Sequence, residues 1–169
     1  MRLFWEHGFE QTSIIDLTRE LGISAPSLYA AFGDKQALFQ EAVTHYEASP
    51  QSVTTAGLAG TSPREVLEAM FDSATREYTS GAHPRGCFVN SEPKLDANRA
   101  QNRAITAARL QEVEEQTESS DDAETLAAFA QVMLVGLSSY ARDGASEKQL
   151  RRVANLALRV TTDSASGSL

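Results

Sequence analysis

Sulfur and imidazole side chains are scarce in this sequence. Its 169 residues include one cysteine, Cys87, and three histidines. A single thiol excludes an internal disulfide framework and is typical of a reducing compartment, so the sequence predicts a cytoplasmic location. With so few metal-binding side chains, we expect no structural zinc site, no other metal and no cofactor.

Long apolar runs and strand patterns are also missing. No stretch approaches the roughly 18–20 apolar residues that span a bilayer, and the first residues lack the apolar core of a signal peptide. No alternating run of Val, Ile or Tyr indicates a strand. With 41% hydrophobic and 22% charged residues, the chain can bury a core, and its apolar periodicity predicts an all-α fold outside the membrane.

Positive charge is the third deficit. The chain has a net charge of −8. Residues 1–48 contain three basic and seven acidic side chains, and residues 49–169 contain twelve basic and sixteen acidic ones. Neither segment has the basic footprint of a strong DNA-binding protein. A DNA-binding function therefore has to rest on a motif.

Residues 1–48 are predicted to form a domain of short helices. Gly8 and Gly22 are placed to end the first and second helices, because glycine adopts the left-handed conformation of a C-cap without strain. Thr12 or Ser13 is placed to begin the second helix and Ser24 the third, since their hydroxyls accept hydrogen bonds from free helical N–H groups. The expected helices span residues 2–7, 13–21, 24–32 and 35–46.

Residues 49–169 are predicted to form a second helical domain, after a connection rich in Ser, Thr, Gly and Ala. Ser62-Pro63-Arg64-Glu65 combines a cap, a proline and a glutamate at the positions typical of a helix start. The expected helices span residues 62–79, 96–117, 123–141 and 146–160. The last two have more apolar residues than a small bundle covers, which favours a two-fold homodimer through these helices over purely internal packing.

The second and third expected helices form a helix-turn-helix pattern around Gly22. Small side chains at Ser24, Ala25 and Ser27 would let the backbone of the third helix approach a major groove closely. Many helical proteins contain such a turn, so the spacing alone does not identify DNA binding. The expected core between the two helices consists of Leu17, Leu21, Ile23, Leu28 and Phe32.

Several short segments recur in the order found in a known family. They are Leu3-Phe4, Gly8-Phe9, Thr12-Ser13, Leu21-Gly22-Ile23-Ser24, Ser27-Leu28-Tyr29, Phe32, Asp34-Lys35 and Ala37-Leu38-Phe39. Over these residues the sequence resembles the N-terminal domain of the tetracycline-repressor (TetR) family of bacterial one-component regulators. Residues 86–90 and 136–144 resemble, more loosely, segments of the ligand-binding domains in one branch of that family.

The resemblance implies contacts between the first domain and operator DNA. Four residues are expected to contact phosphate, namely Thr12, Ser13, Tyr29 and Lys35. Four are expected to face the major groove, namely Ser24, Ala25, Pro26 and Ser27. The alternative for Tyr29 is packing beside Leu28, and the alternative for Lys35 is a solvated helix end.

The sequence also departs from the family. Ile15 and Ala31 lie where members often have polar or basic contacts, so direct base readout is expected to be limited. Members normally have more of the first helix and a basic segment before the Leu-Phe pair. The absence of this basic segment would account for the acidic first domain. The same absence implies a shortened chain, a misplaced start or weakened DNA affinity. The connection at residues 118–122 is also shorter than usual.

The leading interpretation is a ligand-responsive, homodimeric transcriptional repressor that a small apolar effector releases from a palindromic operator. The expected effector pocket lies in the second domain, where apolar lining would favour an apolar ligand. The alternative for each lining residue is an ordinary place in the core. The candidate lining residues are Met70, Phe71, Ala74, Tyr78, Cys87, Phe88, Phe129, Met133 and Leu137.

Other function classes have less support. The sequence contains no glycine-rich phosphate loop and no nucleophile or metalloprotease motif, so an enzyme is not expected. A dimeric helical module that binds a ligand or a protein, with weak or lost DNA binding, remains the alternative because of the acidic first domain. Cys87 follows His83 and Arg85, which would favour a redox-sensitive thiolate, whereas a simply packed thiol is the alternative.

Overall fold

The chain forms two helical units. The structure is a computed structural model that describes residues 1–49, 51–114 and 122–163, and within these ranges every regular element is a helix. The backbone divides into the units Met1–Gln51 and Ser52–Leu169, a division that falls a few residues beyond position 48. The expected helix end at residue 117 lies outside the described residues.

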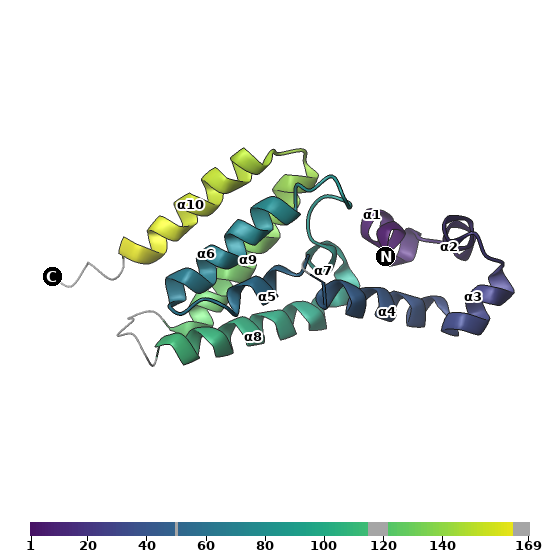
Figure 1. The fold of residues 1–169 in the computed structure, drawn as a ribbon, viewed down its shortest axis with the longest axis horizontal. Coiled ribbons are helices and arrows are strands. Elements are labelled where there is room, and N and C mark those ends of the chain that lie inside the picture. The colour runs from purple at the N-terminus through teal and green to yellow at the C-terminus, as the bar shows by residue number, and fades with distance from the viewer. Residues whose placement is uncertain (50, 115–121, 164–169) are drawn as a thin grey trace. The chain divides into compact units, whose positions relative to one another are not determined.

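The first unit contains α1 (Arg2–Gln11), α2 (Ile14–Leu21), α3 (Ala25–Phe32) and α4 (Lys35–Glu47), labelled in Figure 1. The predicted break at Gly8 is present, but the sequence did not predict the second helical segment that follows it. Gly8 has φ 79° and ψ 165°, so it kinks α1, and helical backbone continues to Gln11. Only glycine adopts this conformation without strain, which explains why the kink lies there.

Aromatic side chains from α1 and α4 make the core of this unit. The rings of Phe4 and Phe9 both meet Phe39 edge-on, with centroids 5.2 and 4.9 Å away. Trp5 meets Tyr46 in the same way at 5.1 Å. These buried rings hold α1 against α4, and the helix-turn-helix pair α2–α3 joins the same unit through buried side chains of its own.

The predicted core of the helix-turn-helix was only partly right. Leu17 and Leu28 are buried, but Leu21 is 48% exposed and Ile23 is exposed as well. Leu21 is the last residue of α2 and the chain turns back at Gly22. Its side chain therefore lies at the rim of the unit, where neighbouring helices cover only half of it.

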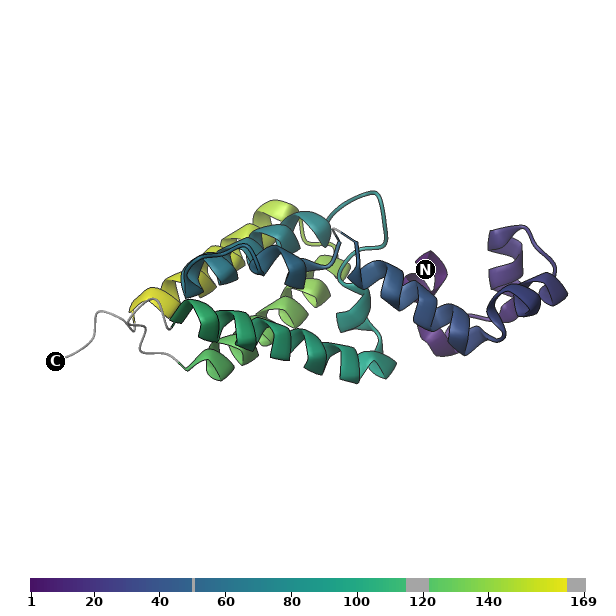
Figure 2. The same ribbon diagram turned by 60° about the horizontal axis from the view of Figure 1, so that its bottom comes forward.

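The second unit is built around four long helices. They are α6 (Pro63–Glu77), α8 (Asp96–Glu114), α9 (Ala123–Arg142) and α10 (Glu147–Asp163). In both Figure 1 and Figure 2, α6 lies along α10 and α8 lies along α9. Three short helices complete the unit: α5 (Val53–Gly57), α7 (Phe88–Ser91) and the 3-10 helix η1 (Pro93–Leu95). The sequence indicated a connection or frayed helix for α5 and no helix for the other two.

The loop after α6 is attached firmly to α9. Arg85 donates hydrogen bonds to the carbonyls of Ala141, at 2.7 Å, and Ala145. The N–H of Cys87 donates to Oγ of Ser138 at 2.8 Å. Among these acceptors, the carbonyl of Ala141 lies in the last turn of α9, where carbonyl groups lack a partner within their own helix.

One face of α9 and α10 stays uncovered in the single chain. The exposed large apolar residues of these helices are Val132, Val135, Tyr140, Val153 and Leu156. Val132 is 69% exposed, although it lies in the middle of a long helix. None of the described helices is both long and apolar enough to cross a membrane. Exposed apolar side chains of this kind on two neighbouring helices are typical of a surface that a second protein covers.

Candidate functional site

The start of α2 is fixed by a capping box. Oγ of Ser13 accepts a hydrogen bond from the N–H of Asp16 at 3.1 Å, and the Asp16 carboxylate accepts one from the N–H of Ser13 at 3.1 Å. The Ser13 hydroxyl also donates to the Asp16 carboxylate, and the two hydrogen bonds that this carboxylate accepts from Ser13, with a smaller contribution from the charge of Arg19, lower the pKa of Asp16. Ser13 stays exposed at the helix N-terminus, where a phosphate would meet the positive end of the helix dipole.

Thr12 has a different place from the one expected. It is 1% exposed, and its hydroxyl donates to the carbonyl of Gly8 at 2.7 Å. That hydroxyl closes the kinked end of α1 and does not face solvent. In this geometry Thr12 acts as a structural residue, and a phosphate contact from its side chain has no support.

The turn between α2 and α3 presents the start of α3 to solvent. Gly22 adopts φ 66° and ψ 27°, and its N–H donates to the carbonyl of Thr18. Ser24 caps α3, and its hydroxyl lies 2.8 Å from the hydroxyl of Ser27. The exposed residues at this end are Ser24, Pro26, Ser27 and Tyr29, whereas Ala25 is half-buried.

Tyr29 is the largest side chain that this surface offers to a partner. It is exposed, whereas Leu28 beside it is fully buried. The phenol of Tyr29 is therefore accessible to a partner, and its contact with a phosphate stays a prediction.

Lys35 begins α4 but points back to α1. Its ammonium donates to the carbonyl of Thr12 at 2.8 Å and lies 4.2 Å from the centroid of the Phe9 ring. The group is half-buried. Lys35 therefore contacts another part of its own unit and is not a fully solvated helix end, while its contact with a phosphate stays a prediction.

The other two cations of this unit also have partners. Arg2 pairs with Glu6 at 3.0 Å, and Arg19 lies 3.8 Å from Asp16. At the neighbouring surface position Ile15 is 67% exposed. The side chains of the first unit therefore present little uncompensated positive charge to a polyanion.

In the second unit, most of the expected effector residues form a packed core. Met70, Phe71, Ala74, Tyr78, Cys87, Phe88 and Leu137 are buried. Phe129 and Met133 are half-buried. The ring centroids of Phe71 and Phe129 lie 6.3 Å apart, so α6 and α9 contact each other at this point of the core.

The phenol of Tyr78 stays neutral in this core. Burial raises its pKa well above the usual value, and neighbouring Cys87 raises the pKa further.

A groove of about 450 Å³ lies elsewhere in this unit, between α6 and α10. It shares only Phe71 with the expected effector residues. In the wall of this groove, the Asp72 carboxylate on α6 accepts hydrogen bonds from Arg76 of the same helix and, at 2.6 Å, from Arg151 of α10. Asp72 and Arg151 are 79 positions apart, so no sequence pattern indicated this pair. The groove is lined by Ala59, Gly60, Glu65, Glu68, Ala69, Phe71, Asp72, Thr75, Arg151, Ala154, Asn155 and Leu158.

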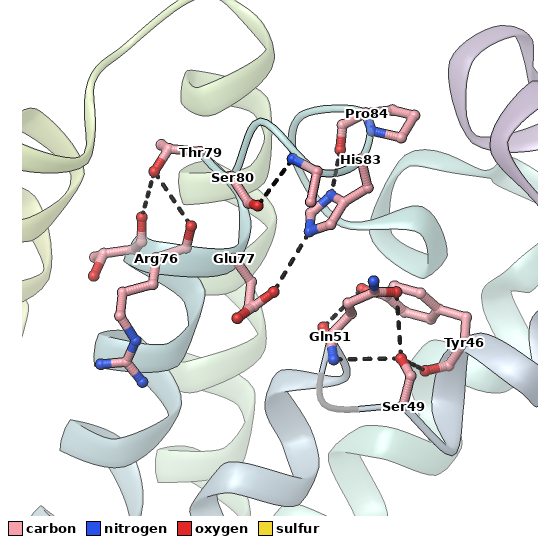
Figure 3. Close-up of polar contacts among 11 residues, drawn as sticks. Tyr46, Ser49, Gln51, Arg76, Glu77, Thr79, Ser80, His83 and Pro84 are labelled. Atoms are coloured by element: carbon pink, nitrogen blue, oxygen red, sulfur yellow. Dashed lines mark hydrogen bonds and ion pairs between the residues drawn. The ribbon is translucent and has the colours of Figure 1, made fainter.

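The histidine of the α6–α7 loop has local partners. Nε2 of His83 lies 3.4 Å from the Glu77 carboxylate and Nδ1 lies 2.9 Å from the carbonyl oxygen of Pro84. Figure 3 marks both contacts with dashed lines. Within the described part of the chain, His, Cys, Asp and Glu side chains form no group of three that could hold a metal ion.

A helix-turn-helix unit with a capped, exposed α3, followed along the chain by a larger helical bundle, is the arrangement of a helix-turn-helix regulator. Residues 1–42 match the model of the family described as bacterial regulatory proteins, tetR family. The chain is 32% identical to the HTH-type transcriptional repressor ComR of Escherichia coli (strain K12), over 95% of this chain and 84% of the relative. It is 31% identical to the repressor BdcR of the same strain, over 92% and 81%.

A solved structure supports the same assignment over the whole fold. A cysteine mutant of the TetR family transcriptional regulator CifR, complexed with 26-bp double-strand operator DNA, matches with a TM-score of 0.86. The two chains are 31% identical over 94% of this chain and 90% of CifR.

The chain therefore belongs to the tetR family of bacterial regulatory proteins. It is a DNA-binding transcriptional regulator and not an enzyme. The family is dimeric and binds small-molecule effectors and double-stranded DNA.

Proposed function

We propose that this chain is a homodimeric repressor whose two α3 helices bind successive major grooves of a palindromic operator. In such dimers the recognition helices lie about 34–36 Å apart, one turn of B-DNA. Unit 1 would be the DNA-binding domain, and unit 2 the domain for dimerisation and effector binding. A regulator of bacterial operators acts where the chromosome lies, which supports a cytoplasmic location.

The exposed apolar face of α9 and α10 is the observation that supports the proposed homodimer. A two-fold axis through this face would bring the same residues of both chains together, as in isologous interfaces. Val132 and Leu156 are its most exposed members. Burying them against a second copy would remove apolar area that a single chain leaves in water.

Among the predicted DNA contacts, the observed geometry supports Ser13, Ser24, Pro26, Ser27 and Tyr29, which are exposed, and partly Ala25. It gives no support to Thr12 and assigns the ammonium of Lys35 to an internal contact. DNA binding would then depend on hydroxyls, helix N-termini and close backbone approach more than on cations.

The effector would be a small apolar molecule that binds among the aromatic and methionine side chains of the second unit. Phe129 and Met133 are half-buried among fully buried neighbours, which supports an entry point at α9. Bound ligand and bound operator would prefer different members of a two-state equilibrium, so each would weaken the affinity for the other.

A binding titration tests this function. Duplex DNA from upstream of the gene would be titrated with the chain at several salt concentrations, beside random DNA of equal length. Sequence-specific binding supports the repressor. If the chain, and a version extended at its N-terminus, bind both duplexes equally, the proposal fails. The alternative is a dimeric helical module that binds a ligand or a protein with weak or lost DNA binding, and the low free positive charge of unit 1 favours it.

The effector is tested separately. Apolar aromatic compounds would be screened for a rise in melting temperature and for release of labelled operator. Met133→Trp should fill the entry point and abolish release while operator binding persists. Leu58→Trp, at an exposed apolar position far along the sequence in the same unit, is the matched control and should respond like the wild type.

A further inference from the structure

The face of α3 that points away from the core is chemically unusual for a DNA-reading surface. Leu28 is fully buried, and the 3.6-residue turn of an α-helix places Pro26 and Ala30 on the opposite side of α3, with Ser27 on the flank between them and Leu28. All three are exposed. The residues of α3, Ala-Pro-Ser-Leu-Tyr-Ala-Ala-Phe, include no charged and no amide side chain.

These side chains restrict how α3 distinguishes bases. Reading guanine or adenine in the major groove normally uses a bidentate Arg, Lys, Asn or Gln. A serine hydroxyl accepts or donates singly, and the hydroxyl of Ser27 already shares a 2.8 Å hydrogen bond with Ser24. What remains on this face is the ring of Pro26 and the methyl group of Ala30.

One group in the major groove matches such a surface. Thymine carries a C5 methyl, which is recognised by contact with small apolar side chains. We propose that Pro26 and Ala30 determine operator specificity by packing against thymine methyl groups in each half-site. This inference rests on the proposed function, because it requires α3 to enter the groove.

The charges of the first unit support the same conclusion. Arg2 and Arg19 face carboxylates, and the ammonium of Lys35 is bound to the carbonyl of Thr12. Phosphate contacts, which give affinity without sequence information, are therefore few on the side chains of this unit. Apolar contacts in the groove would then carry a larger share of the discrimination between sequences.

The experiment starts from a random duplex library, from which the full chain selects its own best site. Each thymine of that duplex is then replaced singly by deoxyuridine, which removes the methyl group and keeps the base pair. At two-fold related positions beneath α3, we expect each replacement to raise Kd about fourfold, the equivalent of one buried methyl group.

A double-mutant cycle connects the effect to Ala30. Ala30→Gly removes only the side-chain methyl, and it should raise Kd on the thymine duplex but not on the duplex with uracil at the contacted position. Ala104→Gly, at an exposed position in the middle of α8, is the matched control for the loss of helix stability. It should raise Kd equally, or not at all, on both duplexes.

The outcomes separate the two proposals. If the library yields no enriched sequence, the proposed function fails and the inference fails with it. If a sequence is enriched but uracil is tolerated at every position, or Ala30→Gly has the same effect on both duplexes, the chain remains a sequence-specific regulator and the methyl readout is overturned.

Discussion

The ammonium of Lys35 donates a 2.8 Å hydrogen bond to the backbone carbonyl of Thr12. The two residues lie at the start of α4 and just beyond the end of α1, and the same ammonium rests 4.2 Å from the Phe9 ring. A positive charge near a helix C-terminus is stabilised by the carbonyl groups that lack partners there. This contact thus adds to the buried aromatic rings that hold α1 against α4.

Lys35→Met should therefore lower the free energy of unfolding and leave the salt dependence of operator binding nearly unchanged. The lost hydrogen bond and cation–π contact correspond to about 1–3 kcal/mol of unfolding free energy. Chemical denaturation measures this loss, with Arg2→Met, which breaks an exposed pair, as the control at less than about 1 kcal/mol. Unchanged stability combined with a shallower salt dependence of operator binding would instead make Lys35 a phosphate contact.

Asp72 provides a pH-dependent link between α6 and α10. Burial acts to raise its pKa, but hydrogen bonds from Arg151 and Arg76 outweigh burial, so the pKa is lowered. Since the folded-state pKa lies below the unfolded value, the stabilisation is fully present above the unfolded pKa of about 3.9. It is lost as the pH falls through the lowered folded value.

Asp72→Asn should accordingly destabilise the protein near neutral pH and make no difference in strong acid. Because this carboxylate is more than a third exposed, we expect a difference of about 1 kcal/mol at most. Denaturation curves between pH 2 and pH 7 (roughly the range around the carboxyl pKa) measure it. Glu68→Gln, whose partner Arg64 lies 3.9 Å away on the same helix, is the control and should have a smaller effect.

Val132→Glu should break the proposed dimer. A carboxylate at this exposed position would be buried against its own copy across a two-fold axis, where like charges repel without compensation. Light scattering should report a monomer, and operator binding should weaken because both half-sites can no longer be occupied together. Leu58→Glu, an apolar-to-acid change at an exposed site outside α9 and α10, should leave the dimer intact. If Val132→Glu remains dimeric, the interface lies elsewhere.

Ile15→Arg should strengthen operator binding and increase its salt dependence. Ile15 is the most exposed large apolar side chain of the first unit, near the N-terminus of α2. If each subunit gains one phosphate contact, the slope of log K against log salt concentration steepens by about 2 for the dimer. Ile15→Gln removes the apolar surface without adding charge, so its slope should match the wild type. Equal slopes for all three proteins would place Ile15 away from the DNA.

Much of the fold followed from local signals in the sequence. The caps at Ser13, Ser24 and Ser62 act through side chains that bond their own helix within three residues, and Gly22 turns the chain by its backbone conformation alone. Such features depend only on residues that are close in the chain, so they can be predicted from the sequence without knowledge of the fold. The run of family-typical segments in the first unit belongs to the same local information.

Only the tertiary structure decided which side chains are buried and which residues from distant segments pair. Lys35 has the residue type of a phosphate contact, yet its ammonium bonds the carbonyl of Thr12 because α1 and α4 meet. The exposure of Leu21 and the pairing of Asp72 with Arg151 follow from packing between distant segments. The sequence determined where the longer helices begin, because capping and turn conformation are local. Which side chains are buried and which residues pair depends on long-range contacts, which no local pattern encodes.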